Sequence, residues 1–277
     1  MLNRIDIRRF KGDILSDEVQ SIYFPGRRGD GHRFHLRDAQ GLGPVKANIS
    51  TAPMASIDGD RFLSASTSGR NIVLTVGLNP QRRSDESVSI LRQLLMSVAP
   101  PKEHVVIGLH FDDQESLYTN GWIESNDPSI FSPNTDQVIS IVAITPYLEK
   151  SSISIPWTNI IGTQYVPYND IQSVGFTLDI EMVGNTSLLT IVETGISKSM
   201  QFRDLRAGDK LRIKTQIGSK SVTLTRGSVT GDALTLMVDR TIWYNLSRDA
   251  SNMFGFTDGQ GAISSALFTY TPVTIGV

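Results

Sequence analysis

Histidines are the side chains best suited to acid–base chemistry near neutral pH, and this 277-residue chain has four of them. His32 and His35 are separated by two residues, so in a strand their rings would point to opposite faces, which makes a poor chelating pair. His104 and His110 flank an apolar segment. These spacings predict structural or surface histidines and no metal site.

A hydrolase would need a nucleophile beside one of these bases. His110 is followed by Asp112 and Asp113, which favours a surface His–Asp contact over a general base. No Gly-x-Ser-x-Gly turn presents a serine, and the chain has no cysteine. The sequence therefore predicts no catalytic residue and no enzyme activity.

Two polar segments could bind ions. Asp112, Asp113 and Glu115 could hold calcium, but the glycine and the twelfth-position Glu of a helix–loop–helix calcium site are missing, which favours a solvated loop. Residues 27–31 (Arg-Arg-Gly-Asp-Gly) suggest a phosphate cradle, but the lysine and hydroxyl of a P-loop are absent. This segment is predicted to be a loop tip, and no cofactor or metal is expected.

Carbohydrate chemistry is the remaining alternative. A glycosidase needs two carboxylates that converge in a cleft. Asp179 and Glu181 alternate along one strand, so both are expected on its exposed face, and Glu193 is isolated from them. A groove lined by Trp243 and Tyr244 could instead stack on a sugar ring, which keeps open a carbohydrate-binding function without catalysis.

Composition limits the classes of partner. The 26 basic and 28 acidic residues give a net charge of −2 without a basic stripe, which argues against sequence-specific nucleic-acid binding. No run approaches the ~20 apolar residues of a membrane span, and charges near Met1 interrupt any signal-peptide core. We expect a protein made in the cytoplasm, without a membrane partner.

The first half reads as strands with one helix. Period-two patterning predicts strands near residues 5–7, 19–24, 45–50, 72–76 and 104–111. A helix is predicted over residues 85–98, with Ser84 or Asp85 as its cap and Pro100 after its end. Its apolar residues have the three-and-four spacing of a helix with one buried face.

Two segments close this half. Residues 121–132 read as a strand followed by an Asp-Pro turn and an aromatic anchor, Phe131. Residues 137–148 are so apolar that neither face of the strand is expected in water. A connection follows at residues 149–154, which predicts a domain boundary between 1–150 and 151–277.

The second half reads as a β-sandwich. Strict alternation over residues 174–182 predicts a strand with one dry face, and short strands separated by glycine turns continue to residue 236. The glycine-rich residues 255–261 are predicted to form a mobile loop before a last strand at 266–270. The predicted fold class is mostly β.

Several segments in this order resemble one family of proteins. They are residues 41–49 and 70–74, the helix at 85–98, the segments at 121–132 and 137–148, the Leu-x-x-Gly-Asp strand entry at 205–213, the stretch from Trp243 to Asn252, and Tyr270-Thr271-Pro272. Together they resemble the distal tail protein (Dit) family of long-tailed phages. Ala250-Ser251 replaces the Pro-Gly turn of relatives.

The resemblance implies an architecture and partners. It implies a ring-forming N-terminal domain, a split barrel with one covering helix, followed by a galectin-like β-sandwich. It implies a homohexamer at the distal end of the virion tail, with the tail tube protein above. Below would lie a tail-tip hub, fibre or tape-measure-associated protein, and the genome would pass through the channel. The outer domain would contact a receptor-binding protein or, in the alternative function, host glycans.

Overall fold

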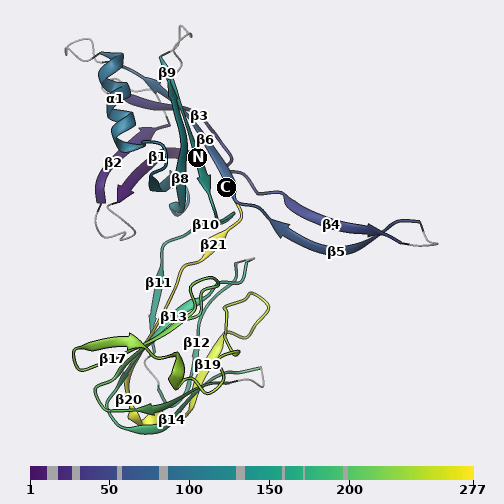
Figure 1. The fold of residues 1–277 in the computed structure, drawn as a ribbon, viewed down its shortest axis with the longest axis vertical. Helices are drawn as coiled ribbons and strands as arrows, with labels where there is room; N and C mark the ends of the chain where they lie inside the picture. Colours follow the sequence, from purple (N-terminus) through teal and green to yellow (C-terminus); the bar gives the residue numbers. More distant parts are fainter. Residues whose placement is uncertain are drawn as a thin grey trace. The chain divides into compact units, whose positions relative to one another are not determined.

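The computed structural model describes residues 1–10, 18–26, 32–54, 58–80, 87–128, 135–157, 160–170, 172–195 and 199–277. Strands dominate these residues, and one α-helix is present among them (Figure 1). The mostly β fold predicted from the sequence is confirmed. No helix in the described ranges is both long and apolar enough to cross a bilayer. The loop predicted at residues 27–31 lies outside these ranges.

Contacts divide the chain into two units. The first contains Met1–Lys150 together with Thr274–Val277, and the second contains Ser151–Val273. The sequence placed all of residues 151–277 in the second unit. The last four residues belong to the first unit instead. β21 (Val273–Thr274) pairs with β10 (Leu148–Glu149), and Arg70 of the first unit donates a hydrogen bond to the backbone carbonyl of Ile275.

A curved antiparallel sheet forms the body of the first unit. The strand order is β2-β1-β7-β8-β9-β6-β3, and β10 pairs with β8. The strands are β1 (Leu2–Phe10), β2 (Glu18–Pro25), β3 (Phe34–Gln40), β6 (Arg70–Leu78), β7 (His104–Phe111), β8 (Leu117–Pro128) and β9 (Asp136–Ala143). β2 and β3 are therefore the two edges of the sheet.

One face of this sheet is apolar and covered. Alternate residues of its strands, among them Ile7, Ile107 and Ile141, are fully buried. The helix α1 (Val88–Val98) packs on this face and contacts β1, β2 and β6. The opposite face carries exposed side chains, including Tyr23 and Trp122.

The helix begins later than its sequence predicts. The Ser87 side chain accepts a hydrogen bond from the backbone N–H of Ile90 at 3.3 Å, which makes Ser87 the N-cap of a helix that starts at Val88. The predicted cap at Ser84 or Asp85 is wrong, and both residues lie outside the described ranges. Ser87 has the same capping chemistry as Ser84 and Asp85, so residue type alone does not select among them.

The predicted Asp-Pro turn is also wrong. Asp127 and Pro128 pair with Val138 and Gln137, so they form the end of β8. A proline is tolerated at this position because the strand ends there. Phe131, the predicted aromatic anchor, lies outside the described residues.

The second unit is a β-sandwich of two sheets, with strand orders β11-β20-β13-β16-β17-β18 and β12-β19-β14-β15. The strands are β11 (Ile153–Pro156), β12 (Thr163–Tyr165), β13 (Phe176–Met182), β14 (Thr186–Glu193), β15 (Ser199–Leu205), β16 (Lys210–Lys214), β17 (Ser221–Arg226), β18 (Val229–Asp232), β19 (Met253–Asp258) and β20 (Ile263–Tyr270), with short helices η1 (Leu234–Leu236) and η2 (Gln260–Ala262). The alternating strand predicted at 174–182 is β13.

Aromatic rings fill the space between these two sheets. Phe176 of one sheet lies 5.3 Å from Phe254 of the other, measured between ring centroids. The glycine-rich segment predicted as a mobile loop is largely β19 and η2 instead. Gly255 is paired on both sides, with Thr163 and with Val192, and this double pairing outweighs the weak strand propensity of glycine.

Candidate assembly surfaces

His110 has a different acidic partner from the one its sequence neighbours suggest. Its Nε2 contacts the Asp6 carboxylate on the adjacent strand β1, and its Nδ1 lies 2.8 Å from Ser116 Oγ. Arg8 Nε donates to the same carboxylate at 2.6 Å. Asp113 instead binds the N-terminal ammonium. The group resembles a Ser–His–Asp chain, but Asp6 is buried and fully engaged, which suits a structural polar cluster.

The other histidines take structural or surface positions. His35 is buried on β3 and lies over Gly77, where an added Cβ would sit 2.3 Å from the imidazole ring. His32 is exposed just before that strand. The His104 ring lies 5.2 Å from the ring of Trp122. No cluster of three or more His, Cys, Asp or Glu side chains suited to a metal occurs in the described part of the chain.

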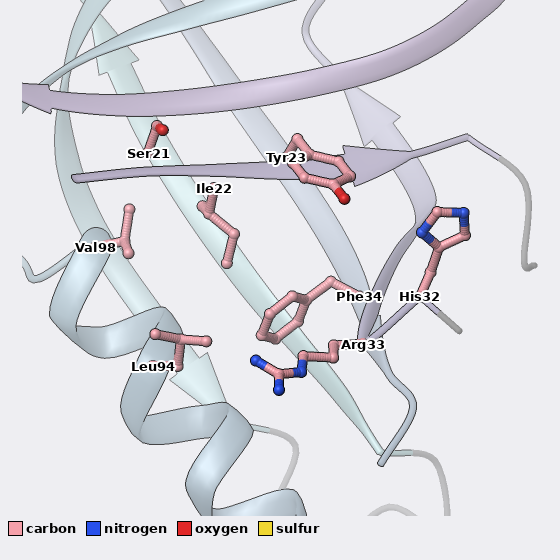
Figure 2. A pocket seen from close by; sticks show the side chains of 8 residues that line it. All are labelled: Ser21, Ile22, Tyr23, His32, Arg33, Phe34, Leu94 and Val98. Carbon is pink, nitrogen blue, oxygen red and sulfur yellow. The ribbon is translucent and has the colours of Figure 1, made fainter. Parts of the chain in front are cut away.

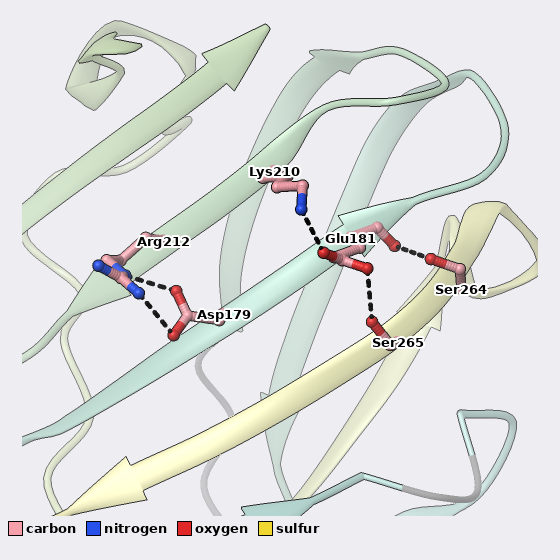
Figure 3. A network of polar contacts seen from close by, with 6 residues as sticks. All are labelled: Asp179, Glu181, Lys210, Arg212, Ser264 and Ser265. Carbon is pink, nitrogen blue, oxygen red and sulfur yellow. Dashed lines mark hydrogen bonds and ion pairs between the residues drawn. The ribbon is translucent and has the colours of Figure 1, made fainter. Parts of the chain in front are cut away.

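The two acids predicted on one strand, Asp179 and Glu181, are each paired with a base (Figure 3). Asp179 accepts two hydrogen bonds from Arg212, at 2.6 and 3.2 Å. Glu181 pairs with Lys210 at 2.7 Å, and the hydrogen bond from Lys210 lowers the pKa of Glu181. These residues line an open hollow of about 470 Å³ together with three threonines. A carboxylate held ionised in this way is a poor general acid.

The structure does not bring together the other residues considered for a sugar site, which are Glu193, Trp243 and Tyr244. Glu193 lies on β14 of the other sheet, where burial raises its pKa. Tyr244 is only 3% exposed, so the predicted Trp243–Tyr244 sugar platform is wrong. Burial raises the pKa of Tyr244 to about 12, and its ring packs on Phe254. Trp243 is half-buried and donates its Nε1–H to the Arg240 carbonyl at 2.8 Å.

A buried arginine connects the segments that carried the family resemblance in the first unit. The Arg70 guanidinium donates to the carbonyls of Gly41, Leu42, Pro146 and Ile275. It is 3% exposed, and burial lowers its pKa. Gly41 has a φ of +80°, and an added Cβ would lie 1.9 Å from the Asn71 carbonyl oxygen. One hydrogen-bonded node thus joins residues 41–42, 70 and 146 with the C-terminal segment.

Two of the segments that carried the resemblance in the second unit contain a side chain that holds a turn by hydrogen bonds. Asp209 of the Leu-x-x-Gly-Asp motif is 1% exposed and accepts hydrogen bonds from Arg226 at 2.6 and 2.8 Å and from the Arg206 backbone at 2.8 Å. Asn252 adopts a left-handed φ of 49°, and its side chain bonds both backbone groups of Ser247. Asn252 thereby closes the turn that begins at Ser247.

A hollow of about 360 Å³ lies where the two edges of the first sheet approach α1 (Figure 2). Ile22, Phe34, Leu94 and Val98 make its apolar part, and the Arg33 side chain is drawn beside the Phe34 ring. Among the residues that the structure describes, its lining contains His32 but no carboxylate. The hollow therefore offers mainly shape and apolar contact.

A two-stranded hairpin stands clear of the first sheet (Figure 1). It consists of β4 (Ala47–Pro53) and β5 (Asp60–Thr67), which pair only with each other, and nearly all of its residues are exposed. The register pairs Ile49 with Ala65 and, after a bulge, Thr51 with Phe62, which leaves Leu63 as the extra residue. The bulge brings Phe62 to the same side as Ile49 and Leu63.

This side of the hairpin is a continuous apolar surface. We call it the hairpin face and define it as Ala47, Ile49, Thr51, Phe62, Leu63 and Ala65. Ile49, Phe62 and Leu63 are 65%, 61% and 54% exposed. Ser64 and Ser66 lie on the other side, which is polar. A lone hairpin is marginal in water, so this surface is suited to a partner.

A second apolar surface lies on the face of the first sheet away from α1. Trp122 of β8 is paired with Val142 of β9, and Ile144 follows two residues later. They are 45%, 38% and 73% exposed. We call these three residues the tryptophan patch. The prediction that neither face of residues 137–148 meets water is therefore wrong for the single chain.

Sequence reasoning missed both apolar surfaces and the Arg70 node. The hairpin could have been found from the alternation of Ile49 and Ala47 with polar residues, but residues 60–67 read as irregular without knowledge of the bulge. No local signal identified Arg70, because its acceptors are backbone carbonyls from distant segments.

Comparisons with known proteins identify solved structures of similar fold. No protein-family model matches the chain, and no curated protein matches it in sequence. The crystal structure of the Dit (gp 19.1) protein of phage SPP1, described as a hub adsorption apparatus, matches with a TM-score of 0.68 and 11% identity, over 87% of this chain and 94% of that one. Chains of the phage P2 baseplate, with calcium and with strontium, match with TM-scores of 0.56 at 9% and 11% identity, over 100% of both chains.

These likenesses extend across both units of the chain. At 9–11% identity they concern the fold alone. The sequence-based prediction of a distal tail protein is thus confirmed at the level of architecture. This chain has the fold of the distal tail hub proteins of long-tailed phages.

Proposed function

We propose that this chain is a structural, non-enzymatic component of a phage virion. Six copies close into a ring that connects the tail tube to the tail tip or baseplate at the distal end of the tail. The tail tube protein docks above the ring, and a tail-tip hub, fibre or tape-measure-associated protein docks below. The genome passes through the central channel without sequence-specific contacts.

Similarity to assembled tail proteins supports this proposal. The SPP1 protein is described as a hub of the adsorption apparatus, and the other two structures are baseplates. Those descriptions belong to the relatives, and they make the same role the most economical one for a chain of the same fold. The near-neutral charge of this chain also suits stacking against other protein rings.

The single observation that carries the proposal is the uncovered hairpin face. A soluble chain that acts alone would gain nothing from a two-stranded projection with Ile49, Phe62 and Leu63 in water. In a ring, each copy offers one patch and receives a different patch of its neighbour, which covers such surfaces on every copy. The paired acids and histidines described above also support a structural role.

Electron microscopy of the purified chain tests the ring. We expect class averages with six-fold symmetry and a central channel. The Ser64→Glu variant, changed on the polar side of the hairpin, serves as a control that should form the same particles. Images dominated by single chains at micromolar concentration would contradict the proposal.

Glycan binding by the second unit is a second candidate. The hollow lined by Asp179, Glu181, Lys210 and Arg212 favours it, because paired charges beside threonine hydroxyls can bind sugar hydroxyls. A glycan array is the direct test. Any ligand should lose binding in Arg212→Ala, and an array without signal would leave only the scaffold role for this unit.

A further inference from the structure

The exposed positions of strand β16 in the second unit are all cations. Leu211 and Ile213 lie in the core, whereas Lys210, Arg212 and Lys214 are exposed. Alternate residues of a strand lie roughly 6.8 Å apart, so these three charges form a row roughly 14 Å long. We call these three residues the basic row. It does not appear as a basic run in the sequence, because the two core residues separate the cations.

The acids of the neighbouring strand β13 neutralise the basic row only in part (Figure 3). The Arg212 side chain is 56% exposed, and that of its partner Asp179 is 31% exposed. The Lys210 and Glu181 side chains are 66% and 48% exposed. The bases are therefore more accessible to a ligand than the acids. Asp179 also occupies only two N–H groups of Arg212, and the guanidinium has further donors.

Lys214 is the cation of the row that has no acidic partner. It lies opposite Thr177 on β13 and opposite Ser221 on β17. Within the part of the chain that the structure describes, no carboxylate forms an ion pair with it. The row therefore has a net positive charge, which is concentrated at the Lys214 end.

Hydroxyl groups border the basic row. A hollow of about 470 Å³ contains Lys210 and Arg212, and a second one of about 220 Å³ contains Lys214. Thr223, Thr225 and Thr230 line the first hollow, and Thr177, Thr269 and Thr271 line the second. A ligand on the row would thus meet cations and hydroxyls together.

Neither hollow offers an aromatic ring for stacking. Among its described lining residues, the first hollow has no aromatic side chain. Phe176 and Tyr270 line the second hollow but are only 2% and 3% exposed. Single-stranded nucleic acids obtain much of their binding from bases that stack on aromatic rings. The surface therefore favours a polyanion that has no bases.

We propose that the basic row binds a polyol-phosphate chain, a polymer of short alcohols joined by phosphodiesters. Such a chain has one negative charge per unit, at a spacing similar to that of the cations. Lysine and arginine bind phosphate oxygens, and the threonine hydroxyls can hydrogen-bond to the phosphates and alcohols. This inference rests on the second candidate function, glycan binding by the second unit, and names the chemical class of its ligand.

Calorimetric titration of the full chain with synthetic poly(glycerol phosphate) tests the inference. We expect log K to fall with log salt at a slope of about −2, because each of the three contacts releases about 0.7 counterion. Lys214→Gln should raise Kd about two- to five-fold and make the slope less steep by about 0.7. Arg203→Gln removes an exposed charge from β15 in the other sheet and should change neither quantity. Equal effects of the two variants would overturn the inference.

Asp179→Asn should have the opposite effect on affinity. It removes the acid that partly neutralises Arg212, so Kd for poly(glycerol phosphate) should fall about two- to five-fold. A pair with a purely structural role would give unchanged or weaker binding after this substitution. Either of those results would overturn the inference.

Comparison polymers test the chemical class of the ligand. A single-stranded oligonucleotide and polygalacturonate of equal charge should both bind more weakly than poly(glycerol phosphate). Equal or tighter binding of either polymer would overturn the choice of a polyol phosphate. If poly(glycerol phosphate) does not bind but the array finds another glycan that depends on Arg212, this inference fails and the second candidate function stands. If neither measurement finds a ligand, both fail.

Discussion

The Arg70 guanidinium donates a hydrogen bond to the backbone carbonyl of Ile275, 205 residues further along the chain. This contact returns the C-terminus to the unit in which the chain began. Together with the pairing of β10 and β21, it makes the second unit an insertion between two strands of the first. The first unit thus contains both Met1 and the residues from Thr274 to Val277.

Replacing Arg70 with Met should strongly destabilise the first unit. The carbonyls of Gly41, Pro146 and Ile275 would lose the Arg70 donor at a partly buried place, while that of Leu42 would keep the Val277 N–H. Each unsatisfied group costs about 1–3 kcal/mol, so we expect a loss of at least about 3 kcal/mol in the free energy of unfolding. Urea unfolding measures it. Arg37→Met is the control, because the exposed Arg37–Asp136 pair should be worth less than about 1 kcal/mol. Equal effects would contradict the role of Arg70.

The first unit should fold without the second. Replacing residues 151–272 with a short Gly-Ser linker leaves β10, β21 and the Arg70 contacts in place. We expect cooperative unfolding of this shortened chain, followed by circular dichroism. Removing residues 274–277 from it as well should lower its stability, because Ile275 is then missing. A shortened chain that is unfolded in buffer would show that the two units depend on each other.

Asp209 should make the second unit acid-sensitive. Hydrogen bonds from Arg226 lower the pKa of Asp209 from its ordinary value, so the stabilisation is complete above about pH 4 and is lost as the pH falls through the folded-state pKa. Asp209→Asn should cost about 2–3 kcal/mol at pH 7 and progressively less on acidification. Asp179→Asn, which breaks a more exposed pair, should cost less than about 1 kcal/mol. A pH-independent difference between Asp209→Asn and the unchanged chain would contradict this.

Asn252 should tolerate glycine better than alanine. Its left-handed φ costs a Cβ-bearing residue about 1 kcal/mol or more, and its side chain satisfies two backbone groups of Ser247. Asn252→Ala is expected to lose about 2–4 kcal/mol, and Asn252→Gly less, because only the hydrogen bonds are removed. Thermal unfolding of the two variants ranks them. The reverse order would show that backbone strain is unimportant at this turn.

Charge on the hairpin face should block assembly without unfolding the chain. Phe62→Glu places a carboxylate in the proposed contact, yet Phe62 is 61% exposed, so the stability of the monomer should change by less than about 0.5 kcal/mol. Ser64→Glu adds the same charge to the polar side. Sedimentation velocity should show dissociation only for Phe62→Glu, and equal behaviour of both variants would contradict the two-sided hairpin.

The sequence predicts the strands whose burial pattern is regular, but it does not predict features that depend on a bulge, on pairing with a distant strand or on another molecule. Alternation identified β13 and the strand 104–111 because one face of each is buried in the core of its own unit. Phe62 escaped notice because a bulge breaks the period of two at Leu63. His110 was assigned to Asp112 or Asp113, whereas strand pairing brings Asp6 to it across 104 residues. Exposed apolar residues such as Val142 read as core because their cover belongs to another molecule in the proposed assembly.

Native mass spectrometry of the purified chain at micromolar concentration tests the central claim most directly. The account predicts a dominant species of six copies for the unchanged protein, and the same species for Ser64→Glu. A dominant single chain across the whole concentration range would contradict it.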